Sequence, residues 1–117
     1  MVLPDPDDAQ TVAELARRFS YNDQKLKDLI LEAHKDFLEL AKIAATKGSE
    51  VGIWYLASAP VYTFYRFDSK GIFALYNHIK RREPVPTIVC HEGGTLYEFF
   101  MKEFRAMVAT DGLARRV

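Results

Sequence analysis

The sequence predicts a single α+β domain in which a sheet of about four strands, mixed or antiparallel, packs against one long helix and a C-terminal helix. Apolar residues first recur every three or four positions, then alternate in short segments, and return to the helical spacing near the C-terminus. The chain has 117 residues, of which 49% are hydrophobic and 27% charged. This length supports one hydrophobic core of ordinary size and is too short for two domains.

The two ends of the chain are expected to lie outside the folded domain. We predict a flexible leader over residues 1–10, the single domain over 11–110 and a tail over 111–117 that is frayed or contacts a partner. The leader, "MVLPDPDDAQ", is acidic and interrupted by prolines, so it does not resemble a signal peptide. No stretch approaches the roughly 20 apolar residues of a membrane span. We therefore expect a cytoplasmic protein with no membrane partner.

Two helices are expected before the sheet. The segment "TVAE" fits a capping box that opens a short helix over Thr11–Phe19. A long amphipathic helix is predicted over Asp23–Lys47, and Gly48 ends it. The apolar stripe of the long helix consists of Leu26, Leu29, Ile30, Ala33, Phe37, Leu40, Ala41 and Ala44.

Four strands and a last helix follow. The strands are predicted over Glu50–Leu56, Val61–Phe67, Gly71–Asn77 and Pro86–Glu92, and "DSKG" makes the hairpin between the second and the third. The last helix is expected over Leu96–Ala109, with Thr95 and Glu98 as its capping box. Its predicted apolar face consists of Leu96, Phe99, Phe100, Phe104, Met107 and Val108.

Charge and cysteine content exclude several classes of function. Sixteen basic residues balance sixteen acidic ones, so the overall positive field that attracts nucleic acid is absent and no nucleic-acid partner is expected. The single cysteine, Cys90, has no disulfide partner in the chain, which indicates a reducing compartment and a small core residue. His91 points to the opposite face of the strand, so the two cannot act as a Cys-His pair. The histidines show no metal-binding spacing, and we expect no metal or cofactor.

The order of helix, strand, hairpin, strand and helix resembles a known family. The segments "FYRFD", "PTIVCHEGG" and "LYEFFMKEF" follow one another with the spacing found in one half-unit of the phospholipase D-like (PLD-like) fold. The chain is similar, over about residues 23–108, to the PLD-like modules of unknown function that occur beside helix-turn-helix domains in bacterial predicted regulators. The resemblance implies a PLD-like half-unit with a regulatory, ligand-sensing or dimerisation role.

The same resemblance implies that the catalytic motif is degenerate. Active members use His-x-Lys-x-x-x-x-Asp, in which the histidine attacks phosphorus, the lysine neutralises phosphate and the aspartate orients the histidine. With Asp68 at the last position, the histidine and lysine positions hold Val61 and Thr63, which supply neither a nucleophile nor a positive charge. Members of the superfamily pair two half-units, so the resemblance also implies a homodimer.

A His-x-Lys spacing does occur later in the chain, at His78 and Lys80. It leaves open an alternative, a phosphodiesterase or nuclease that uses these two residues at a dimer interface. Val85 stands where that motif would require aspartate, which argues against catalysis. The segment remains a basic loop, in which Arg81 and Arg82 join His78 and Lys80 as candidates to bind a small phosphate-containing ligand or an acidic protein. The plain alternative is a solvated loop.

Two further candidate sites follow from the pattern. Gly93, Gly94 and Thr95 precede the last helix, where backbone N–H groups can face an anion; a structural turn with a cap is the competing interpretation.

Trp54, Tyr62 and Phe64 form the second candidate site. We expect one face of the aromatic strands to enter the core and these three rings to lie on the other, as a protein interface. Such an interface leaves open a third alternative, an immunity-type module that binds another protein.

Overall fold

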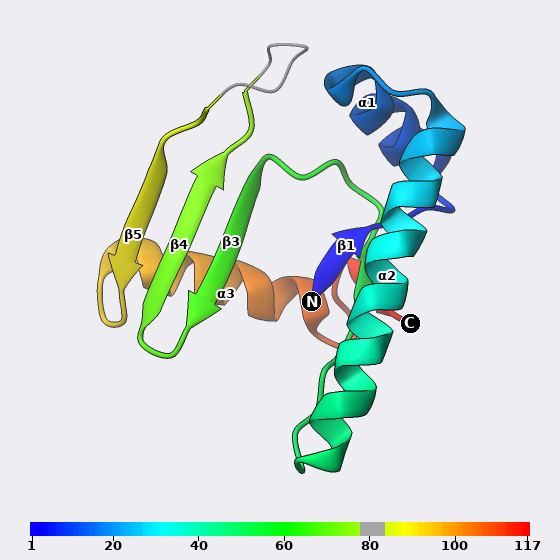
Figure 1. Ribbon diagram of the computed structural model, residues 1–117. Helices are drawn as coiled ribbons and strands as arrows, with labels where there is room; N and C mark the ends of the chain where they lie inside the picture. Colours follow the sequence, from blue (N-terminus) through cyan, green and yellow to red (C-terminus); the bar gives the residue numbers. More distant parts are fainter. Residues whose placement is uncertain (78–83) are drawn as a thin grey trace.

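The computed structural model describes residues 1–77 and 84–117, and within them it confirms an α+β fold. The described residues form three helices and two three-stranded sheets (Figure 1). In chain order the elements are β1 (Val2–Pro4), α1 (Ala9–Phe19), α2 (Asp23–Thr46), β2 (Trp54–Leu56), β3 (Tyr62–Phe67), β4 (Lys70–Leu75), β5 (Thr87–His91), α3 (Thr95–Val108) and β6 (Ala114–Arg116). None of these three helices combines the length and the apolar character needed to cross a bilayer.

The first sheet joins the two ends of the chain through β2. Strand β1 runs parallel to β2, with Leu3 opposite Tyr55, and β6 runs antiparallel to β2, with Arg115 opposite Tyr55. The predicted flexible leader contains β1, and the predicted frayed tail contains β6. The prediction is therefore wrong for the residues of these two strands. Hydrogen bonding to the two free edges of β2 orders these short segments, although neither shows a long enough alternation to reveal a strand.

The second sheet has the order β3-β4-β5 and is antiparallel throughout. The predicted hairpin is confirmed: Phe67 pairs with Lys70, and Asp68 adopts a φ of +51° in the turn between them. The prediction of one sheet of about four strands is wrong, because β2 does not join this sheet. Both edges of β2 are occupied by β1 and β6, so no edge remains for β3.

The first two helices have aspartate and asparagine caps. The carboxylate of Asp8 accepts a hydrogen bond from the Thr11 backbone N–H at 2.8 Å, so the predicted capping box at Thr11 begins three residues too late. Asn22 caps α2 in the same way through the Lys25 backbone N–H. Gly48, with a φ of +73°, follows the end of α2 as predicted.

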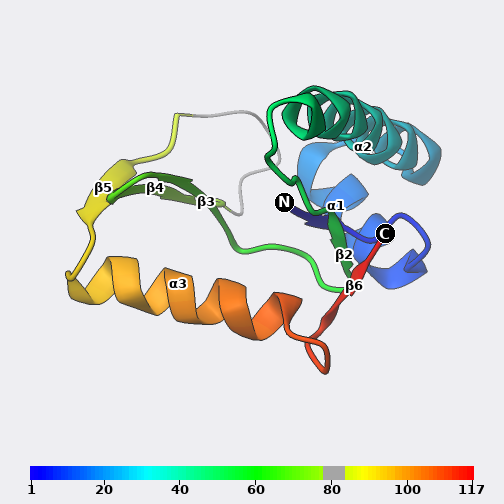
Figure 2. The same ribbon diagram turned by 90° about the horizontal axis from the view of Figure 1, so that it is seen from below.

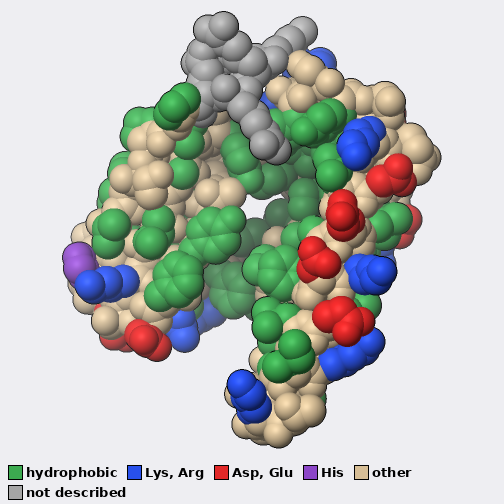
Figure 3. All heavy atoms as spheres, viewed as in Figure 1, with side chains coloured by type: hydrophobic (Ala, Val, Ile, Leu, Met, Phe, Trp, Pro, Cys, Tyr) green, Lys and Arg blue, Asp and Glu red, His purple; other side chains and the backbone are tan. Residues whose placement is uncertain are grey.

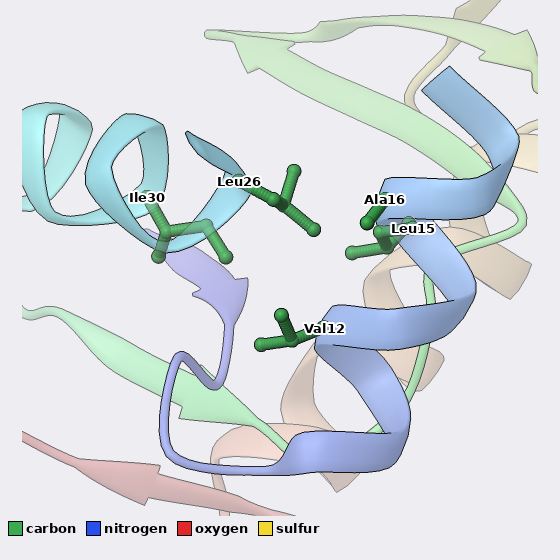
Figure 4. Packing of buried hydrophobic residues seen from close by; sticks show 5 residues of the cluster. All are labelled: Val12, Leu15, Ala16, Leu26 and Ile30. Atoms are coloured by element: carbon green, nitrogen blue, oxygen red, sulfur yellow. The ribbon is translucent and has the colours of Figure 1, made fainter. Parts of the chain in front are cut away.

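Two separate hydrophobic clusters stabilise the fold. The first lies between α1 and α2 and is shown in Figure 4; it consists of Val12, Leu15, Ala16, Leu26 and Ile30. The second lies between the β3-β4-β5 sheet and α3, which runs beneath that sheet (Figure 2). The predicted stripe of α2 is buried only in its first half, since Leu40 in the second half is exposed.

The buried face of α3 differs from the predicted one. Tyr97, Phe100 and Met101 are buried, whereas Leu96 and Phe99 are exposed. The helix is rotated so that Tyr97 faces the sheet, where its hydroxyl donates to the backbone carbonyl of Asp68 at 3.2 Å. A spacing of three or four residues fits several overlapping stripes on an apolar helix, and the contact with the sheet selects one of them.

Candidate interaction surface

The β3-β4-β5 sheet has one covered face, and aromatic rings fill it. The Phe100 ring of α3 lies 4.8 Å from that of Tyr62, 5.0 Å from that of Phe64 and 4.6 Å from that of Phe73, measured between ring centroids. Tyr62 and Phe64 were expected at an interface, but the protein's own last helix covers them. The predicted assignment of the two faces of β3 is therefore reversed, because alternation separates two faces without saying which one a helix covers.

A glycine makes room for this packing. A Cβ atom on Gly71 would lie 2.5 Å from the Phe64 ring and 2.8 Å from the sulfur of Cys90, closer than such atoms approach. Gly71 therefore allows the Phe64 ring to lie against the backbone of β4.

The opposite face of the same sheet is not covered by a described helix, and we call it the outward face. The strand registers place on it Thr63, Tyr65, Phe67, Lys70, Ile72, Ala74, Thr87, Val89 and His91. Tyr65 is 52% exposed, Phe67 is 61% exposed and Val89 is 54% exposed. Figure 3 shows hydrophobic side chains gathered over these strands. Large exposed rings that neighbour one another on a sheet are typical of a contact surface.

The three positions that the sequence analysis aligned with the catalytic motif lie in or next to β3, which is an outer strand of this sheet. Val61 is exposed and directly precedes β3, and Thr63 lies on the outward face. Asp68 lies in the hairpin turn, where its backbone carbonyl is already bonded to the Tyr97 hydroxyl. Neither Val61 nor Thr63 supplies an imidazole ring or a positive charge at these positions.

The remaining predicted binding residues are those of the basic loop and Trp54. His78, Lys80, Arg81 and Arg82 lie outside the described residues. Trp54 belongs to the other sheet, where the Arg116 guanidinium lies over its ring at 5.5 Å.

The predicted anion site before α3 is occupied by the chain's own acceptors. The Gly93 N–H donates to a carboxylate oxygen of Glu98 at 3.2 Å, and the Gly94 N–H donates to the His91 carbonyl at 2.9 Å. Thr95 is the first helical residue, and the N-cap is Gly94, which has no side-chain cap. The arrangement is that of a closed turn, in which Glu98 takes the place of an external anion.

A polar cluster that the sequence did not reveal ties the two ends of the chain together. The Arg115 guanidinium donates to both carboxylate oxygens of Asp5, at 2.7 and 2.9 Å, and lies over the Tyr55 ring at 5.1 Å. The Tyr55 hydroxyl is hydrogen-bonded to Nδ1 of His34 at 2.5 Å. The Arg115 hydrogen bonds hold the pKa of the buried Asp5 carboxyl below its usual value, and burial raises the pKa of Tyr55.

This cluster predicts a pH-dependent stability. Asp5→Asn is expected to lower the free energy of unfolding at pH 7 by about 1–2 kcal/mol, because it removes charged hydrogen bonds from a buried group. The folded-state pKa of Asp5 lies below its unfolded value, so the stabilisation is complete above about pH 5 and is lost as the pH falls below about 4. In urea unfolding, the difference between the wild type and the variant should therefore be constant from pH 7 to about pH 5 and shrink as the pH falls below about 4.

The matched control is Asp7→Asn, since Asp7 contacts the same guanidinium but its side chain is 81% exposed. This variant should change the free energy of unfolding by less than about 0.5 kcal/mol. Equal losses in the two variants would contradict the assignment of the effect to the buried carboxylate.

Cys90 and His91 lie on β5 as the alternation predicts. Cys90 is buried in the second cluster, with its sulfur 3.4 Å from the Gly71 carbonyl, and His91 is exposed on the other face. Within residues 1–77 and 84–117, no three histidine, cysteine or acidic side chains lie close enough together to hold a metal ion. Comparisons of the chain with protein-family models, with curated proteins and with solved structures gave no match.

Proposed function

We propose that the chain is a non-catalytic PLD-like regulatory module whose working form is a homodimer. The observation that carries the proposal is the incomplete covering of the β3-β4-β5 sheet, of which α3 covers one face while the outward face remains exposed. A half-unit that needs a second half to complete its surface has this property.

The absence of catalysis is argued from the residues at the motif positions. Val61 and Thr63 offer no group that attacks phosphorus or neutralises a phosphate. They lie beside Tyr65 and Phe67, so this side of β3 presents apolar surface.

Self-association is argued from surface and charge. Tyr65, Phe67 and Val89 are each more than half exposed and lie on the same face of the sheet, where neighbouring apolar side chains favour a protein contact. The chain has a formal net charge of zero, so two copies approach each other without overall repulsion. A symmetric pair brings the same part of the two copies together and joins their apolar surfaces.

Native mass spectrometry of freshly purified protein, combined with an assay on a chromogenic phosphodiester, tests this proposal. We expect twice the 13.4 kDa mass of the chain and no turnover above that of buffer. A monomer across the micromolar range would contradict the homodimer. Turnover by the wild type that His78→Ala abolishes would instead support the phosphodiesterase alternative.

A further inference from the structure

Strand β5 is the last strand of the second sheet, and among the described residues no strand pairs with its outer side. The sheet order places β4 on one side of β5 and no described strand on the other. In Figure 1, β5 lies on the side of its sheet away from α2, whereas β3 faces the rest of the molecule. A free strand edge is a template on which another strand can add.

The hydrogen-bond pattern shows which backbone groups of β5 point away from the sheet. The Glu92 N–H donates to the Ser69 carbonyl, and in an antiparallel ladder hydrogen-bonded pairs recur at every second residue. Cys90 and Ile88 are therefore the residues bonded to β4. The N–H groups of Thr87, Val89 and His91, and the carbonyls of Thr87 and Val89, are directed outward.

This edge is complementary to itself. Val89 is the middle residue of Thr87–His91, so an antiparallel pair of these strands places Val89 opposite Val89 of the second copy. The His91 N–H then meets the Thr87 carbonyl of the second copy, and no two like charges stand opposite each other. The strand also lacks the lysine or internal proline with which proteins commonly block an exposed edge.

Side chains at the edge would add apolar contact to the backbone bonds. Val89 is exposed on the outward face, and Ile88 is exposed on the face toward α3. Helix α3 begins beneath β5 (Figure 2), and Leu96 in its first turn is exposed as well. A strand added at this edge would therefore gain contacts on both faces of the sheet.

We propose that β5 pairs antiparallel with β5 of a second copy of this chain, with Val89 opposite Val89 on the twofold axis. The inference rests on the proposed homodimer and specifies its contact. The two β3-β4-β5 sheets become one continuous sheet, and the two outward faces become one apolar surface across the dimer.

A charge exchange at Val89 tests the register. Val89→Lys and Val89→Glu each place like charges opposite each other, so each variant alone should raise the dissociation constant of the dimer at least about tenfold. An equimolar mixture should recover a heterodimer, seen as a mixed mass in native mass spectrometry, because lysine then faces glutamate. Single variants that remain as dimeric as the wild type would overturn the pairing.

Tyr65→Lys is the matched control, since Tyr65 lies on the outward face in the same row as Val89 and is exposed to the same degree. This variant should leave the dissociation constant unchanged. If Tyr65→Lys dissociates the dimer while the Val89 variants do not, the outward faces pack on each other and the edge pairing is wrong, although the homodimer stands. A monomeric wild type would overturn both.

Amide hydrogen exchange of the wild type provides a test that needs no variant. The Val89 N–H should exchange slowly at concentrations where the protein is dimeric and rapidly on dilution, because its only proposed partner is in the second copy. Rapid exchange at all concentrations would overturn the proposal.

Discussion

Phe100→Ala is expected to lower the free energy of unfolding by about 3–5 kcal/mol, measured by urea unfolding at a fixed protein concentration. Phe100 is buried, and its ring contacts those of Tyr62, Phe64 and Phe73. Alanine would remove the centre of the second cluster and leave a cavity between α3 and the sheet. Because the sheet carries the proposed contact, dimerisation should weaken in the same variant.

The neighbouring Phe99 provides the control. Its side chain is 53% exposed and meets Phe100 only edge to face. Phe99→Ala is expected to cost less than about 1 kcal/mol. A loss as large as that of Phe100→Ala would show that Tyr97, Phe100 and Met101 are not the buried face of α3.

Leu15→Ala should lower the free energy of unfolding by about 2–5 kcal/mol, again measured in urea. Leu15 is 2% exposed and lies in the cluster between α1 and α2 (Figure 4). Deleting its side chain leaves a cavity where the two helices meet, and alanine itself is a good helix former, so the loss comes from packing.

Leu31→Ala is the control for Leu15→Ala. It makes the same substitution on α2, at a residue that is half exposed. The same chemical change there should alter the free energy of unfolding by less than about 0.5 kcal/mol. If the two leucine variants lost equal stability, the first cluster would not be the core of this part of the molecule.

Local pattern was sufficient for the helices and the hairpin. The long helix was predicted over Asp23–Lys47 and runs over Asp23–Thr46, because a long apolar period and a glycine at its end are both local signals. The hairpin at Asp68 followed from turn residues between two apolar segments. Alternation on β5 likewise placed Cys90 inside and His91 outside.

The sequence analysis assigned the wrong aromatic rings to the exposed face of β3. The sequence identified an exposed aromatic face of β3 but assigned Tyr62 and Phe64 to it, whereas Tyr65 and Phe67 occupy it. Period-two alternation fixes which rings share a face. The choice of the covered face depends on where α3 lies, and that helix is far away in the sequence.

The sequence by itself determined where helices and turns form and which side chains share a face, because these depend on neighbours within a few residues. The tertiary structure decided that the two ends pair with β2, that Arg115 bonds to Asp5 across 110 positions, and that α3 covers one face of the second sheet. Such contacts depend on which distant segments satisfy a free strand edge or a buried charge. The pattern of residues within one segment does not predict which distant segment that is.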